Sequence, residues 1–225
     1  MNESVIIVAG GQGMRMGGSI PKQFLLINGL PVLMHTINRF FKYNPKITVI
    51  LVLPALQIDY WTDLCNRYDF TMAHTIIEGG ETRFHSVYNG LKAVTQEGLI
   101  AVHDGVRPFV SVKTITECFN MAGQHGAAIP VTEPVESIRH LSEFESKACR
   151  REEYRLVQTP QVFDSQLLKQ CYAQPWSPAF TDDASVVEST GHPIKLVTGN
   201  RENIKITSPF DLTVAEAIVN SNLLD

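Results

Sequence analysis

Short apolar runs alternate along this chain with segments whose apolar residues recur at helical spacing. The apolar runs predict strands at residues 4–9, 47–53, 74–77, 99–103, 127–131 and 194–197. Between them, amphipathic segments predict helices at 31–43, 55–68, 83–95 and 112–124. This alternation favours right-handed βαβ units. We therefore expect an α/β fold with a mainly parallel, twisted sheet and helices on both faces.

Two helix starts carry recognisable signals. Pro31 is predicted at the first position of the first helix, where its fixed φ is favourable. The last helix is predicted to begin after Ser208 as the cap, with Pro209 first and Asp211 completing a capping box. With 225 residues, 44% of them hydrophobic, the chain can bury one substantial core, so residues 1–225 are predicted to form a single domain.

Residues 132–154 interrupt the alternation. The segment is rich in charge, contains Pro134 and a Cys149-Arg150-Arg151 cluster, and has no sustained helical period. Long segments of this kind inside a compact domain are usually functional or mobile. Alternating side chains at 135–140 also permit a strand. The segment is therefore interpreted as a protruding β-arm that can reach another subunit, with a disordered surface loop as the alternative.

Composition and charge limit the classes of binding partner and the cellular compartment that we expect for this protein. A formal net charge of -4 argues against nucleic-acid and membrane-surface binding, which normally need a basic surface. No segment approaches the roughly 18 apolar residues of a membrane span, and no cationic leader precedes an apolar run. The four cysteines include no Cys-x-x-Cys pair, which is typical of reduced thiols rather than a structural zinc site. We expect a cytoplasmic protein.

A glycine-rich segment directly follows the first predicted strand. It contains Gly10, Gly11, Gly13 and Arg15, and a Pro-Lys-Gln segment with Lys22 follows. Glycines let main-chain N–H groups approach an anion, and the two cations can neutralise its charge. The spacing fits neither a dinucleotide fingerprint nor a P-loop. The segment predicts a phosphate site, with a solvated glycine turn as the alternative.

A second polar cluster closes the strand predicted at 99–103. Asp104 lies where ligands bind in open α/β sheets, and its carboxylate can hold a magnesium ion that bridges phosphate oxygens. The alternative is that Asp104 only pairs with Arg107. His103 is interpreted as a buried, hydrogen-bonded histidine rather than a catalytic group. Lys205 alternates with apolar neighbours and is taken as solvated unless its loop faces the same cleft as Lys22.

The chain resembles the 2-C-methyl-D-erythritol 4-phosphate cytidylyltransferase family, because six motifs of that family occur in it in the same order. Together they cover nearly the whole chain. They are the glycine loop with Pro21-Lys22-Gln23, Glu78-Gly79-Gly80-Glu81 with Arg83 and Ser86, His103-Asp104 with Arg107-Pro108, Gln158-Thr159-Pro160-Gln161, Thr181-Asp182-Asp183-Ala184 and Asn203-Ile204-Lys205. The resemblance implies a Rossmann-like nucleotidyltransferase fold and a homodimer joined by interlocking arms. It also implies magnesium-dependent transfer of CMP from CTP to 2-C-methyl-D-erythritol 4-phosphate, with release of pyrophosphate.

The resemblance also implies a role for individual residues. The catalytic cations would be Arg15, Lys22, Arg151 and Lys205. The nucleotide would be bound by Ala9, Gly10, Gly11, Gly13, Gly80, Glu81, Ser86 and Asp104, with Asp104 at the metal or the ribose. The acceptor would be bound by Arg107, Ser137 and Thr159, with Ser137 and Arg151 reaching in from the partner's arm.

Some positions depart from the family's usual residues. Gly10 stands where alanine is common, Gly105-Val106 replaces a common alanine pair, and Ser137 replaces a common threonine. These departures leave two alternatives open. One is a cytidylyltransferase for ribitol 5-phosphate or a related polyol phosphate, and the other is a nucleotide-sensing module without catalysis. The joint presence of Arg15, Lys22, Asp104 and Lys205 argues against the sensor, which would not need cations around the reacting phosphorus.

Overall fold

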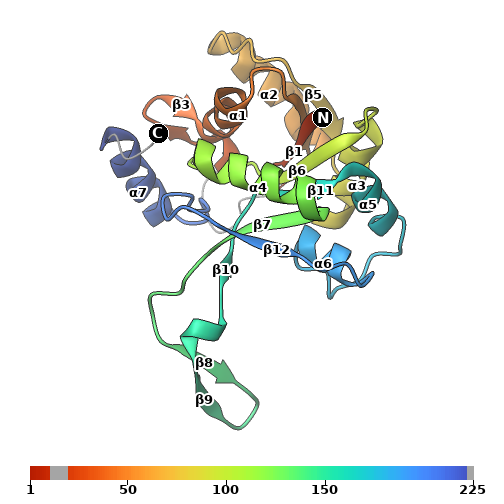
Figure 1. The fold of residues 1–225 in the computed structure, drawn as a ribbon. Coiled ribbons are helices and arrows are strands. Elements are labelled where there is room, and N and C mark those ends of the chain that lie inside the picture. Colours follow the sequence, from red (N-terminus) through yellow and green to blue (C-terminus); the bar gives the residue numbers. More distant parts are fainter. Residues whose placement is uncertain (11–19, 222–225) are drawn as a thin grey trace.

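A sheet runs through the middle of the molecule, with helices on both sides of it (Figure 1). The computed structural model describes residues 1–10 and 20–221. Within these residues the sheet has eight strands. They are β1 (Asn2–Val8), β4 (Thr48–Leu53), β5 (Thr75–Glu78), β6 (Gly98–Asp104), β7 (Ala127–Thr132), β10 (Leu156–Val157), β11 (Gln161–Asp164) and β12 (Lys195–Thr198). Their order is β10-β7-β11-β6-β1-β4-β5, and β12 also pairs with β7.

Parallel strands make up one half of the sheet. β1 lies between β4 and β6, so that Ile6 is opposite both Ile50 and Val102, and β4 pairs with β5 in the same direction. The six predicted strands are all present, with ends within two residues of those expected. The predicted α/β class with a mainly parallel sheet is confirmed. The carboxyl ends of these parallel strands meet at one edge, where a cavity opens.

An antiparallel strand, β11, separates the two halves of the sheet. It pairs with β6 on one side and β7 on the other, and β10 continues the antiparallel pairing with β7. The sequence analysis did not predict β10 or β11, because 156–164 was taken as an apolar stretch leading into an Xaa-Pro turn. The Thr159–Pro160 peptide bond between the two strands is cis.

Two layers of helices cover the two faces of the sheet, and successive side chains along a strand point alternately into one layer and the other. In β1, Val5 and Ile7 face one layer and Ile6 faces the other. The first layer consists of α1 (Val32–Tyr43), α2 (Ala55–Arg67) and α4 (Val112–His125). The second consists of α3 (Arg83–Ala93), α5 (Ser165–Cys171) and α6 (Asp183–Glu188). The four helices predicted between strands are present, whereas α5 and α6 were not predicted.

The predicted placement of Pro31 at the first helical position is wrong. Its ψ of 139° is extended, so it is the cap of α1, and it also ends the short β2–β3 pair, β2 (Leu26–Ile27) with β3 (Leu30–Pro31). The strand pairing of Leu26 with Pro31 keeps this residue out of the helix. The sequence shows the proline but not the hairpin that fixes its ψ.

The final helix, α7 (Pro209–Asn220), packs outside the two main layers. Its Ala215 and Ile218 belong to a small apolar cluster that includes Phe109 and Ile206. The predicted cap is confirmed, because the Ser208 hydroxyl accepts from the Asp211 N–H and Asp211 Oδ2 accepts from the Ser208 N–H at 2.7 Å. The helix therefore starts where the sequence indicates, directly after the segment that carries Lys205.

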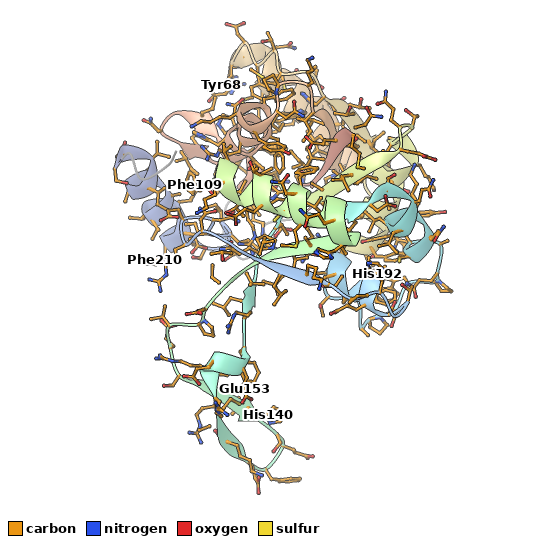
Figure 2. The ribbon with its side chains drawn as sticks, in the orientation of Figure 1. Tyr68, Phe109, His140, Glu153, His192 and Phe210 are labelled. Carbon is orange, nitrogen blue, oxygen red and sulfur yellow. The ribbon has the colours of Figure 1, made fainter. Side chains whose placement is uncertain are left out.

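The segment 132–154 leaves the body as an arm (Figure 1). A hairpin of β8 (Ile138–Leu141) and β9 (Ser146–Cys149) lies at its far end, followed by a short 3-10 helix, η3 (Arg151–Glu153). Figure 2 labels His140 and Glu153 on this arm, well away from the sheet. The hairpin exposes Leu141 and Phe144, the latter to 88% of its surface. An apolar surface this exposed favours the predicted contact with a second chain.

The four cysteines are free thiols. In the part of the chain that the structure describes, no helix has the length and apolar character needed to cross a bilayer.

The capping box of α7 gives a stability prediction. Replacing Ser208 by alanine removes the acceptor for the Asp211 N–H, so the free energy of unfolding should fall by about 1 kcal/mol in urea titrations. Thr213, exposed in the middle of the same helix, provides the control. Thr213→Ala should not lower stability, because alanine is the better helix former. Equal losses in the two variants would contradict the capping role.

Candidate active site

A cavity of about 510 Å³ opens at the carboxyl ends of β1, β4, β5 and β6. Loops from these four strands and two segments from elsewhere in the chain supply its walls. The lining residues are Val8, Ala9, Gly10, Lys22, Gln23, Pro54, Ala55, Gly79, Gly80, Glu81, Thr82, Arg83, Ser86, Asp104, Val106 and Lys205. This is the edge at which open α/β sheets bind their ligands.

One wall is a tight turn after β5. The Gly79 N–H donates to the Leu53 carbonyl at 2.8 Å, and the Gly80 N–H donates to Ser86 Oγ at 3.1 Å. Ser86 Oγ in turn donates to the Thr82 carbonyl at 3.0 Å. A side chain at Gly80 would collide with the Cβ of His85, so the turn requires glycine here. The turn thereby holds the main chain of Gly79 and Gly80 at the cavity wall.

A second part of the wall is fixed by a buried glutamine. Gln23 Nε2 donates to the Ala9 carbonyl at 2.9 Å and also contacts Gln57 of α2. Gln23 is fully buried in the 3-10 helix η2 (Lys22–Phe24), which follows Pro21. Because Gln23 is anchored to the end of β1, the adjacent Lys22 is held at the cavity. The Pro-Lys-Gln segment therefore presents a cation next to the chain that leads into the glycine loop.

Asp104, at the end of β6, is surrounded by cations. Lys205 Nζ lies 2.9 Å and Arg107 Nε 3.2 Å from Oδ2, while Arg83 Nε lies 3.8 Å from Oδ1. Burial alone raises the pKa of Asp104, but the three cations outweigh it and hold that pKa well below its usual range. Asp104 is thus a permanent anion that organises the positive charge of the cavity.

The backbone around Asp104 is held by its neighbours. Thr159 Oγ1 accepts from the Asp104 N–H at 3.1 Å and lies 3.0 Å from His103 Nδ1. His103 Nε2 lies 3.0 Å from the Arg107 carbonyl, so Nε2 carries the proton and Nδ1 accepts from Thr159. Burial lowers the pKa of His103 to about 4. This agrees with the interpretation of His103 as a buried, satisfied histidine.

Most of the predicted nucleotide-binding residues and two of the predicted catalytic cations, Lys22 and Lys205, meet at the cavity. Those that line it are Ala9, Gly10, Lys22, Gly80, Glu81, Ser86, Asp104 and Lys205. Lys205 meets the condition set for it, since its loop faces the cleft that holds Lys22. Gly11, Gly13 and Arg15 lie outside the described residues.

The predicted acceptor residues lie elsewhere. Arg107 and Thr159 contact Asp104 but do not line the cavity, and Arg107 also donates to the Asn203 carbonyl at 2.8 Å. The pairing of Asp104 with Arg107, considered as an alternative, is therefore present. Ser137 and Arg151 belong to the arm, where Arg151 donates to the Val135 carbonyl at 2.7 Å. No arm residue is among the described residues that line the cavity.

Two residues of the site were missed as functional groups. Arg83 was quoted only as part of a motif, yet it lines the cavity and approaches Asp104. Arg83 lies at the start of the helix after β5. Because open α/β sheets bind ligands at the carboxyl ends of their strands, this position could have identified it from the sequence. Gln23 gives no such signal, because its buried contact with Ala9 depends on the tertiary fold.

Carboxylates for a metal are few. Asp104 and Glu81 are the acidic residues on the cavity wall, and the described residues contain no group of three or more His, Cys, Asp or Glu side chains that could hold a metal. Magnesium commonly binds through one or two carboxylates with substrate phosphates as further ligands. The two carboxylates on the cavity wall fit this kind of magnesium binding. They are too few for a site in which the protein supplies every ligand.

The chain is similar to known proteins over nearly its full length. Residues 4–221 match the model of the 2-C-methyl-D-erythritol 4-phosphate cytidylyltransferase family. An enzyme of that description from Bacteroides thetaiotaomicron is 56% identical over 219 residues, covering 97% of this chain and 100% of the relative.

Solved structures agree with this match. The cytidylyltransferase of the same description from Thermus thermophilus superposes with a TM-score of 0.79 and 32% identity, covering 98% of this chain and 100% of the other. The 4-diphosphocytidyl-2C-methyl-D-erythritol synthase from Anaerococcus prevotii gives a TM-score of 0.83 at 28% identity, covering 97% and 96%. Fold and sequence thus point to the same family.

The buried His103 predicts a pH-dependent stability. In the unfolded chain this imidazole takes up a proton below about pH 6.5, whereas the folded protein resists protonation until about pH 4. The unfolded state then binds more protons, so stability falls as the pH is lowered through this window. Between pH 6.5 and 5 the unfolding free energy should drop by about 1.5 kcal/mol more in the wild type than in His103→Gln. The unfolding free energy is measured by urea denaturation at several pH values in this range. The same pH dependence in the wild type and in His103→Gln would contradict the assignment.

Proposed function

The chain belongs to the 2-C-methyl-D-erythritol 4-phosphate cytidylyltransferase family, and from that membership we propose how its cavity carries out the family's reaction. The protein is a nucleotidyltransferase of isoprenoid precursor biosynthesis. It transfers CMP from CTP to 2-C-methyl-D-erythritol 4-phosphate and releases pyrophosphate. The observation that carries the residue assignments is the convergence of Lys22, Lys205 and the Gly79–Gly80 turn on one cavity.

In our assignment the cytosine lies against the turn after β5. Gly80, Glu81 and Ser86 form this wall, and Ala9 with Gly10 forms the facing wall. Both walls present main-chain groups at fixed positions, which suits recognition of the donor and acceptor edge of a base. A base with the wrong edge leaves these groups unpaired, so CTP is favoured over other nucleotides.

The triphosphate lies over the cations. An acceptor phosphate monoester is largely a dianion near pH 7, so one of its oxygens attacks the α-phosphorus of CTP without a general base. The new bond forms as the bond from the α-phosphorus to the bridging oxygen of pyrophosphate breaks, and pyrophosphate leaves. Lys22 and Lys205 stabilise the negative charge that develops at the α-phosphoryl group during this exchange. Asp104 holds Lys205 in place by the 2.9 Å contact. From the family resemblance we also assign Arg15, which lies outside the described residues, to the triphosphate.

Magnesium is proposed as the metal of the reaction. Asp104 would be its protein ligand, with the remaining ligands supplied by phosphate oxygens and water. When bound, the ion neutralises phosphate charge and orients the triphosphate.

The acceptor site is proposed to be shared between two chains. Arg107 and Thr159 support its floor through their contacts with Asp104. Ser137 and Arg151 lie on the arm, outside the cavity of their own chain. We assign them to the partner's cavity in a homodimer, where the planar guanidinium of Arg151 can bind the acceptor phosphate through two parallel bonds.

A pyrophosphate-release assay tests the function. With CTP and 2-C-methyl-D-erythritol 4-phosphate the protein should release pyrophosphate steadily, and replacing CTP by ATP or the acceptor by ribitol 5-phosphate should abolish most of the rate. Preference for ribitol 5-phosphate would establish the polyol alternative. Nucleotide binding without pyrophosphate release from any pair would establish the sensing module and refute transfer.

A subunit-mixing experiment tests the shared site. Lys22→Ala and Arg151→Ala should each be nearly inactive alone, with losses of about two to three orders of magnitude, as expected for one transition-state contact. After unfolding and joint reassembly about half of the dimers are mixed, and one of the two cavities in each carries neither lesion. Activity should return to about a quarter of the wild-type value. Verified mixed dimers without recovered activity would place Arg151 in the cavity of its own chain.

A further inference from the structure

The motif Thr181-Asp182-Asp183-Ala184 has no role in the mechanism above, yet the fold holds it firmly. Asp182 caps α6, accepting from the Ser185 N–H. Gln161 of β11 donates to Asp182 Oδ2 and accepts from the Ala184 N–H, both at 2.8 Å. The start of α6 is thereby fixed to the middle of the sheet. Asp183, between these two anchored residues, has its carboxylate fully buried.

The buried carboxylate of Asp183 is fully engaged. Arg83 donates to both of its oxygens, Nη1 to Oδ1 at 3.0 Å and Nη2 to Oδ2 at 2.6 Å. The Tyr172 hydroxyl also donates to Oδ1 at 2.6 Å. Burial raises the pKa of Tyr172 well above its ordinary value, so this hydroxyl stays protonated and remains a donor. Two parallel bonds and a third donor fix the plane of the Arg83 guanidinium.

The third nitrogen of Arg83 connects this pair to the cavity. Arg83 Nε lies 3.8 Å from Asp104 Oδ1, whereas Lys205 and Arg107 contact Oδ2. Asp104 therefore has cations on both of its oxygens, and Arg83 is the one on the Oδ1 side. Burial alone lowers the pKa of Arg83, but Asp183 and then Asp104 outweigh it and raise that pKa above its ordinary value. The guanidinium is a permanent charge.

Asp183 and Arg83 differ in exposure, and this difference indicates which of the two side chains positions the other. The Asp183 side chain is 0% exposed, whereas that of Arg83 is 31% exposed and lines the cavity. A buried ion pair adds little net stability compared with apolar residues of similar volume. An apolar pair could fill this space, but it could not place a charge beside Asp104.

We infer that Asp183 is a positioning residue for the transfer reaction: it holds Arg83 so that Arg83 fixes the Oδ1 side of Asp104 and leaves Lys205 aligned on Oδ2. The inference rests on the proposed function, because it assumes that Asp104 and Lys205 act on the nucleotide. Asp183 itself touches no reacting atom. It acts through Arg83, and Tyr172 supports it from behind.

A double-mutant cycle tests the inference. Asp183→Asn keeps the shape but removes the charge that orients Arg83, so kcat should fall about 10- to 100-fold, the size expected from a misplacement near the reacting centre. KM for CTP should stay within about threefold, because the cytosine walls are untouched. In an Arg83→Gln background, the same Asp183→Asn change should alter kcat by less than about threefold, since the residue through which it acts is gone.

Two further variants separate positioning from folding. Tyr172→Phe removes a single donor and should give a smaller loss in kcat with the same unchanged KM. The matched controls are Tyr43→Phe, which removes a tyrosine–carboxylate bond of 2.9 Å, and Glu3→Gln, which removes only the charge of its acceptor. This bond lies near the amino end of β1, far along the strand from the cavity. These controls should leave kcat within about twofold of the wild type at a temperature where all variants are folded by circular dichroism.

The outcomes are distinct. A kcat near the wild-type value in folded Asp183→Asn, or an equal loss with and without Arg83, would overturn the positioning role. If Asp183→Asn does not fold, the cycle is closed with Tyr172→Phe in place of it, and additive losses of Tyr172→Phe and Arg83→Gln would overturn the role equally. Failure of the proposed function is recognised separately, because the wild type itself would then release no pyrophosphate from CTP and 2-C-methyl-D-erythritol 4-phosphate.

Discussion

The charge of Asp104 is the constraint around which the site is arranged. A carboxylate that is almost removed from water needs cations and hydrogen bonds, and this one obtains them from segments far apart in the sequence. Arg83 comes from the helix after β5, Arg107 from the loop after β6, and Lys205 from the segment before α7. The need to neutralise one anion thus gathers positive charge at a single edge of the sheet, beside the cavity.

Local sequence patterns predicted the parts of this arrangement that depend on neighbouring residues. The apolar runs of β1 and β6 give the strands, and the polar residue that ends β6 marks the binding edge, because a buried run must close where the chain meets solvent. The cap of α7 is readable for the same reason, since Ser208 and Asp211 are three residues apart. The alternation around Lys205 left its environment open, and the fold shows that this residue lines the same cavity as Lys22.

Other features depend on contacts that no local pattern encodes. Arg83 and Asp183 are 100 residues apart, and nothing near either residue identifies its partner. β11 is only four residues long and carries no periodic signal, so its place between β6 and β7 arises from the sheet as a whole. The ψ of Pro31 is likewise set by pairing with Leu26 rather than by the helix that follows.

The position of β11 also has a consequence for the order in which the sheet can assemble. Among the described strands, β7 pairs only with β10, β11 and β12, all of which follow it in the chain. As the polypeptide leaves the ribosome, β1, β4, β5 and β6 can associate first, whereas β7 is connected to them only when residues 161–164 have been synthesised and pair with both β6 and β7. The arm is made during this interval. Its synthesis therefore precedes closure of the sheet, and the late antiparallel strand joins the two halves in one step.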